Sequence, residues 1–143
     1  MRISAKADYA VRALLELAAA PAGSSRSARE LAEAQGIPQN FLENILSELR
    51  RAGLVRTHRG PTGGSSLARG ADAITLADIL RAVDGPLAAV RDLPPESLDY
   101  PGAACRLPAV WCSVGDSLGR MLGQLTVADL VDLPAASRAG VSG

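Results

Sequence analysis

The sequence predicts a mainly α-helical fold with a small β wing: a winged helix-turn-helix followed by a long C-terminal dimerisation helix. Three observations predict it. Two short helical segments are separated by a glycine turn, two strand-like runs then flank a glycine-rich tip, and a later segment repeats apolar residues at helical spacing. The expected divisions are a winged helix-turn-helix at 1–85, a sensor loop or linker at 86–102, a dimerisation helix with a short terminal helix at 103–133, and a flexible tail at 134–143.

The first part of the helix-turn-helix carries clear start and stop signals. Before the helix-turn-helix, a separate helix is expected over residues 6–20. Ser27 and Glu30 form an S-x-x-E capping box, which starts a short helix by satisfying its free backbone N–H groups. Gly36 is expected to end that helix, because glycine accepts the left-handed conformation of a tight turn. Pro38 is expected in the first turn of the second helix, where its missing N–H costs nothing.

The second helix of the pair shows one apolar stripe. Its members recur at helical spacing and are expected to face the core: Phe41, Leu42, Ile45, Leu46 and Leu49. Polar residues occupy the other faces, and Gly53 ends the helix. These polar faces fit either a solvated surface or a helix that reads the major groove of DNA.

Strand-like runs at 54–58 and 65–69 predict a hairpin around the tip Arg-Gly-Pro-Thr-Gly-Gly of residues 59–64. Arg56 and Arg59 bring positive charge to this hairpin, and His58 lies between them in the sequence. Folding alone does not require this set. Two helices, a hairpin and a basic tip, in that order, favour double-stranded DNA as the partner. The alternative is a winged-helix module that binds proteins and not DNA.

Charge is distributed unevenly, although the formal net charge is zero. Residues 1–69 contain 10 Lys+Arg against 6 Asp+Glu, and residues 70–143 contain 5 against 9. The basic half is therefore the half with the helix-turn-helix. Phosphate neutralisation drives non-specific DNA binding, so this balance favours specific binding with modest non-specific affinity.

The C-terminal half predicts three further helices. T-x-x-D capping boxes at 75–78 and 126–129 start two short ones, and a long helix begins near Ala103 or Pro108 and runs to about Leu125. Apolar residues, among them Leu122, form a seam along one side of this long helix. Two copies of the helix packed across a twofold axis through this seam would form a homodimer. The expected dimer contacts are Leu107, Val110, Trp111, Val114, Leu118, Met121 and Leu125.

Several motifs together resemble the IscR/NsrR-type winged-helix regulators of bacteria. They are the opening M-R-I-S-A-K-A-D-Y-A-V-R-A, the helix pair A-x-x-Q-G-I-P-x-x-F-L-E-x-I-L-x-x-L-R-x-A-G-L-V, the wing R-G-P-x-G-G, and the later V-W and T-V-A-D-L. The resemblance covers nearly all of residues 1–133. It implies a homodimeric transcription regulator, usually a repressor, that binds a near-palindromic operator and often senses nitric oxide, redox state or iron–sulfur status.

The resemblance also implies which residues meet DNA. Arg59 matches the wing arginine, the wing glycines and proline shape the tip, and Gln39, Asn40 and Glu43 match the reading positions of the second helix. Asn and Gln pair with adenine edges, and Glu accepts from cytosine N4. With the neighbouring cations, the expected DNA-binding set is Gln39, Asn40, Glu43, Arg50, Arg56, His58, Arg59, Gly60, Pro61, Gly63 and Gly64.

The sensor half departs from the family pattern. Cluster-binding members carry three cysteines, whereas here only Cys105 matches one of them and Cys112 lies outside the set. Asp8 matches a carboxylate that the partner subunit donates in certain members. Three interpretations stay open: these three residues hold an iron–sulfur cluster, the two cysteines form a thiol switch, or both are buried core thiols.

We expect no cluster of the usual three-cysteine kind, and hence no cofactor in protein purified in air. Cys105, next to Arg106, is expected to be more reactive than Cys112, which follows Trp111 and is expected to be buried.

Catalysis and membrane insertion are not expected. The chain has one histidine, and it lacks both the G-x-G-x-x-G pattern and the phosphate-binding loop of nucleotide enzymes. No apolar run reaches the ~20 residues that cross a bilayer, and the N-terminus lacks the apolar core of a signal peptide. These features predict a non-enzymatic cytoplasmic protein.

Overall fold

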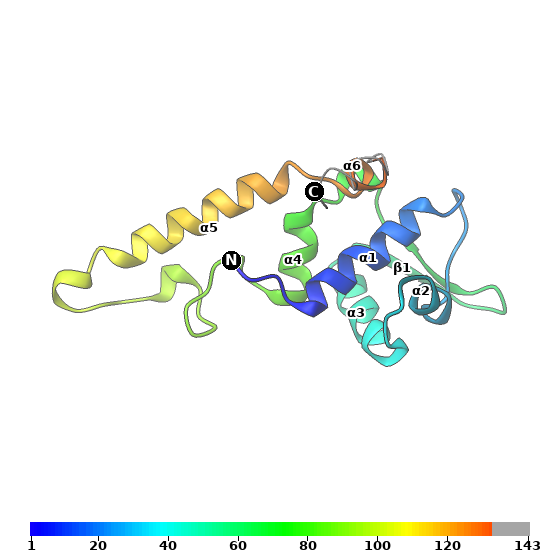
Figure 1. Ribbon diagram of the computed structural model, residues 1–143, viewed down its shortest axis with the longest axis horizontal. Coiled ribbons are helices and arrows are strands. Elements are labelled where there is room, and N and C mark those ends of the chain that lie inside the picture. Colours follow the sequence, from blue (N-terminus) through cyan, green and yellow to red (C-terminus); the bar gives the residue numbers. More distant parts are fainter. Residues whose placement is uncertain (133–143) are drawn as a thin grey trace, which may run out of the picture.

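The computed structural model describes residues 1–132 and has an elongated shape (Figure 1). The predictions for residue 133 and for the tail 134–143 concern residues outside this described range. The order of the elements is α1 (Ala5–Ala19), α2 (Ala28–Gln35), α3 (Gln39–Arg51), β1 (Val55–His58), β2 (Gly64–Leu67), η1 (Ala71–Ala73), α4 (Leu76–Asp84), η2 (Pro95–Ser97), η3 (Gly102–Ala104), α5 (Leu107–Gly123) and α6 (Val127–Val131).

Two regions make up this shape. Helices α1 to α4, the β1–β2 wing and α6 form one body, and α5 extends from it as an arm (Figure 1). The connecting segment (residues 85–106) runs from α4 outward along the arm, and α5 then returns to the body (Figure 1). The short helix η2 of this connecting segment packs against α5. No helix in the described part of the chain is long and apolar enough to cross a membrane.

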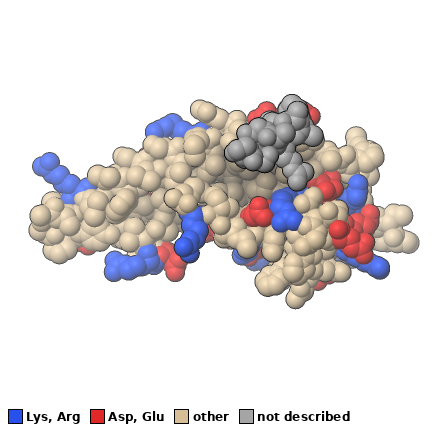
Figure 2. Space-filling model, in the orientation of Figure 1, with Lys and Arg blue, Asp and Glu red and all other residues tan. Residues whose placement is uncertain are grey.

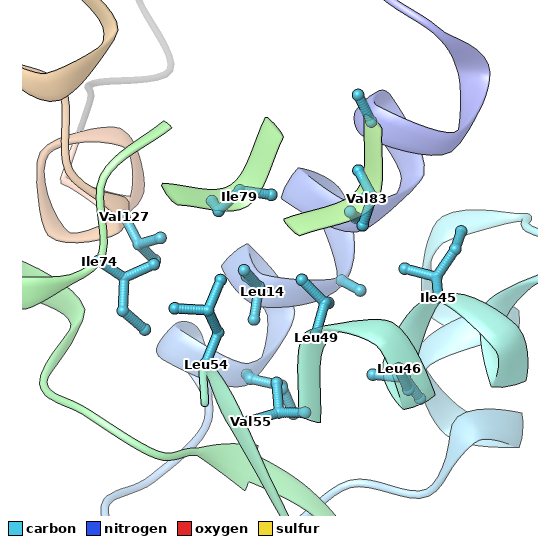
Figure 3. Packing of buried hydrophobic residues seen from close by; sticks show 14 of the residues in the cluster. Leu14, Ile45, Leu46, Leu49, Leu54, Val55, Ile74, Ile79, Val83 and Val127 are labelled. Atoms are coloured by element: carbon cyan, nitrogen blue, oxygen red, sulfur yellow. The ribbon is translucent and has the colours of Figure 1, made fainter. Parts of the chain in front are cut away.

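Helix α1 lies at the centre of the body and contacts α2, α3, α4 and α6. Leu14 of α1 is fully buried, and Figure 3 shows Leu49, Leu54 and Ile79 around it. Val127 of α6 is also fully buried. The C-terminal end of the described chain therefore completes the core of the N-terminal body.

The local start and stop signals form as predicted. Ser27 and Glu30 close a reciprocal capping box at α2, and Gly36 ends that helix with a φ of 63°. The T-x-x-D boxes also close at α4 and α6. These two helix starts lie side by side, because the Leu76 N–H donates to the Leu125 carbonyl at 2.9 Å and the Val127 N–H donates to the Ile74 carbonyl at 2.9 Å.

Three expectations about side-chain placement are wrong in detail. Pro38 is the N-cap of α3 and precedes its first turn. The side chain of Phe41 is 59% exposed, although the apolar stripe had placed it in the core. Leu122, a member of the predicted seam on α5, is buried against its own body. For Phe41 and Leu122 the periodic pattern is present, and the neighbouring elements decide which part of the stripe is covered.

The wing is tied to the rest of the body through one additional backbone pair. β1 and β2 pair antiparallel, and Arg26 forms an isolated bridge with Ser65 of β2. The Ser65 N–H donates to the Arg26 carbonyl at 2.7 Å. A Cβ at Gly64 would collide with the backbone of Arg26, so only glycine permits this close approach.

We therefore expect Gly64→Ala to lower the free energy of unfolding by about 1–3 kcal/mol, the usual cost of overpacking. Amide exchange at Ser65 should accelerate at the same time. Urea unfolding at a fixed chain concentration and hydrogen exchange measure the two effects. Gly123→Ala is the control, because no heavy atom lies within 4 Å of the added Cβ. Equal stability of the two variants would contradict the close approach.

Candidate nucleic-acid interface

Helix α3 has one buried face and one exposed polar face. The buried face holds Leu42, Ile45, Leu46 and Leu49. At about 100° per residue, Asn40 and Arg51 point away from this face, and both are exposed. The helix therefore combines a firm attachment to the core with a free polar surface.

The predicted reading residues lie on this exposed face. Gln39, Asn40, Glu43 and Arg50 are all exposed, and the Gln39 amide Nε2 donates to Glu43 Oε1 at 3.1 Å. Contact with a base edge must compete with this exposed hydrogen bond. The structure adds Asn44 and Arg51 to the same face; their signal in the sequence is their spacing from Asn40.

Contacts from α1 and the N-cap hold the reading helix in place. Lys6 of α1 forms an ion pair with Glu48 of α3, with Nζ and Oε1 2.7 Å apart. Pro38 restricts the backbone at the N-cap, and Ile37 before it is buried. The backbone at the start of α3 is consequently restricted, and the later part of the helix is paired to α1.

The wing tip is shaped by its glycines. Gly60 has a φ of 112°, which favours glycine, and its carbonyl accepts from the Gly63 N–H at 2.9 Å. A Cβ at Gly63 would lie 2.5 Å from the His58 carbonyl oxygen. Arg59 and Pro61 are exposed on this tight turn. The turn therefore presents an arginine on a compact backbone.

Arg56 and His58 occupy a different surface from Arg59. They line a groove of about 550 Å³ between the loop after α1 and the wing, and Arg69 joins them there. His58 Nε2 lies 2.7 Å from Ser66 Oγ, and an Arg56 guanidinium nitrogen donates to the Ala68 carbonyl at 3.3 Å. The expected DNA contacts thus divide into a reading face, a wing tip and a basic groove beside the wing.

The arm helix α5 also has two faces. One side is turned toward the body and the connecting segment, and it carries Pro108, Gly115 and Leu122. An added Cβ at Gly115 would lie 3.2 Å from the Ala88 Cβ, which shows how closely that segment packs. The predicted dimer contacts fall on the other side or its edge, and Figure 2 shows a mostly uncharged surface along the arm.

The two cysteines have different surroundings. Both are free thiols, Cys105 exposed and Cys112 half-buried. Cys112 lines a cleft of about 370 Å³ between α5 and the connecting segment, together with Arg81, Glu96 and Asp116. The interpretation in which both are buried core thiols is therefore wrong for Cys105, because the chain before α5 is not covered by the body.

A cluster site is not assembled within one chain. Among the described residues, no three His, Cys, Asp or Glu side chains are grouped as metal ligands would be. Asp8 instead accepts from Arg12, with Oδ2 and the guanidinium nitrogen 3.1 Å apart. One chain therefore does not fit an iron–sulfur cluster, and the version with Asp8 of the partner subunit stays a prediction.

Comparison with known proteins decides the family. The Rrf2 family profile, described as an iron-dependent transcriptional regulator, matches residues 3–133. This chain belongs to the Rrf2 family. A Mycobacterium tuberculosis H37Rv protein, described as a candidate HTH-type transcriptional regulator, is 48% identical over 130 residues, which are 91% of this chain and 81% of the relative. IscR of Erwinia tasmaniensis is 33% identical over 132 residues, 92% and 79% of the two chains.

Solved structures of this family share the fold. CymR, the global cysteine regulator of B. subtilis, superposes with a TM-score of 0.73 at 33% identity, over 92% of this chain and 96% of CymR. T. potens IscR gives a TM-score of 0.71 at 32% identity, over 92% and 86%. The expected mainly α fold with a β wing and the resemblance to IscR-type regulators are confirmed, and the chain is a transcriptional regulator of the Rrf2 family.

The exposure of the two thiols predicts their order of reaction. We expect iodoacetamide to label Cys105 faster than Cys112 in the native chain, because Cys105 is exposed. Mass spectrometry of the labelled peptides measures both rates. Unfolding in urea should bring the two rates close together, which serves as the control. Faster native labelling of Cys112 would overturn the order.

Proposed function

We propose that this regulator acts as a homodimeric repressor of transcription. Each subunit inserts α3 into the major groove of a half-site and directs the wing arginine into the adjacent minor groove. The operator is near-palindromic, because a twofold protein dimer is matched by two inverted half-sites. The wing carries this proposal: Arg59 is exposed on a glycine-shaped turn next to a helix with a free polar face. A narrow minor groove attracts such an arginine.

Exposed apolar surface supports the dimer. Ten large hydrophobic side chains are exposed in the described part of the chain, and five of them belong to the predicted contacts along α5: Leu107, Val110, Val114, Met121 and Leu125. Leu118 lies among them and is half-buried. Soluble monomers rarely expose a continuous apolar face of this kind. A second copy of α5 would cover it in the manner of a short coiled coil.

The signal enters through a thiol in this proposal. Cys105 and Cys112 are the only cysteines of the chain, and they flank the start of the arm helix. A structure of Staphylococcus aureus CymR, 27% identical to this chain, is described as an oxidised form. Modification of a thiol at this end of α5 would alter the packing between α5 and the connecting segment. It would thereby change the spacing of the two α3 helices in the dimer.

The wing assignment predicts a loss of DNA affinity in Arg59→Ala. An operator duplex is first selected from a random pool by the wild-type chain, and affinity is then measured at fixed salt. We expect Arg59→Ala to cost about 1–3 kcal/mol, since base contacts by arginine contribute this much. Arg120→Ala removes an equal charge from the arm and should change affinity little. Unchanged affinity of folded Arg59→Ala would contradict the wing contact, and failure to select any duplex would favour a protein-binding module.

The dimer interface is tested by placing a charge on its apolar face. Val110 is 52% exposed, so Val110→Glu should leave the subunit folded. In the dimer this carboxylate would be buried without a partner, which costs several kcal/mol, and we expect monomers at micromolar concentration. Ala109→Glu is the control, because residue 109 lies on the solvent side of α5. Light scattering measures the mass of each variant, and a monomeric wild-type chain would overturn the dimer.

A further inference from the structure

Phe41 is the one aromatic side chain that the body leaves exposed. The chain contains one Phe, one Trp and two Tyr. Tyr9, Tyr100 and Trp111 are half-buried, whereas Phe41 is 59% exposed in the first turn of α3. Folding does not require an apolar ring at this position, because its stripe neighbours fill the core without it.

The position of this ring on α3 brings it to the reading face. With about 100° per residue, Phe41 lies roughly a quarter turn from Asn40, the residue opposite the buried face. Gln39 lies on the other flank at a similar angle. The first turn of a recognition helix is the part that approaches base edges most closely. Phe41 therefore borders the same surface as the two amides that are expected to read bases.

We propose that Phe41 contacts the C5-methyl group of a thymine in the operator half-site. The proposal rests on the function proposed above and names one feature of its DNA sequence. In the major groove the thymine methyl is the apolar group among the base edges, and a phenyl ring has no hydrogen bond to offer any other. Asn40 beside it can pair with adenine, so this end of α3 is suited to an A·T pair or step.

The helix that carries the ring is held in position before DNA binds. Pro38 caps α3 with a φ of −58°, and Ile37 before it is 4% exposed. The ion pair between Lys6 and Glu48 attaches the same helix to α1 about two turns further on. A rigid first turn allows a contact as small as one methyl group to discriminate between bases.

Replacement of single thymines by deoxyuridine tests the contact, because this change removes only the methyl group. Each thymine of the selected half-site is replaced in turn. At one position we expect the wild-type affinity to fall about fourfold, the equivalent of one buried methyl group. Phe41→Ala should bind the unmodified operator more weakly and should be insensitive to that same replacement. Phe41→Leu keeps an apolar side chain and should retain part of the sensitivity.

Leu93→Ala is the matched control, since Leu93 is an exposed apolar residue outside the reading face. It should keep the wild-type response to every replacement. Circular dichroism establishes that each variant is folded. The proposal is overturned if the wild-type chain tolerates deoxyuridine at all positions, or if Phe41→Ala keeps the same sensitive position. In both cases DNA binding itself persists, so the proposed function stands; a wild-type chain that binds no duplex overturns both.

Discussion

The close packing of α1 is the constraint on which the rest of the body depends. Its inner face carries three fully buried alanines, Ala7, Ala10 and Ala13. Small side chains let the surrounding helices approach closely, and larger ones would push them apart. Two polar contacts orient α1 relative to its neighbours. Lys6 forms an ion pair with Glu48 of α3, and Arg12 Nε donates to Gln35 Oε1 of α2 at 3.0 Å. The orientation of the reading helix is therefore set by a helix that need not touch DNA.

The arm helix links this body to the proposed dimer. One side of α5 packs on its own subunit through small residues and Leu122, and the other side leaves an apolar face free. Cys112 lies on the inner side, in the cleft with Arg81 and Asp116. In the proposed dimer, a change there would act on the angle between arm and body and hence on the separation of the two α3 helices.

The proposed recognition of DNA is divided among surfaces with different chemistry. The exposed face of α3 offers amides, a carboxylate and one phenyl ring, which suit base edges. The wing tip offers one arginine on a turn that glycine alone can form, which suits a narrow groove. The groove beside the wing gathers Arg56, His58 and Arg69, which suit phosphates. In the proposed complex, separate residues of one small body would position the protein and read the sequence.

The sequence by itself determined the elements and their order, because capping boxes, turn glycines and the wing tip act over a few residues. Ser27 with Glu30, Gly36 and the two T-x-x-D boxes behave as their local chemistry requires. The tertiary structure alone decided which members of an apolar stripe are covered. Phe41 and Leu122 both fit a helical repeat, yet one is exposed and the other buried. A stripe is wider than the surface that covers it, so the packing partners, distant in sequence, select the buried side chains.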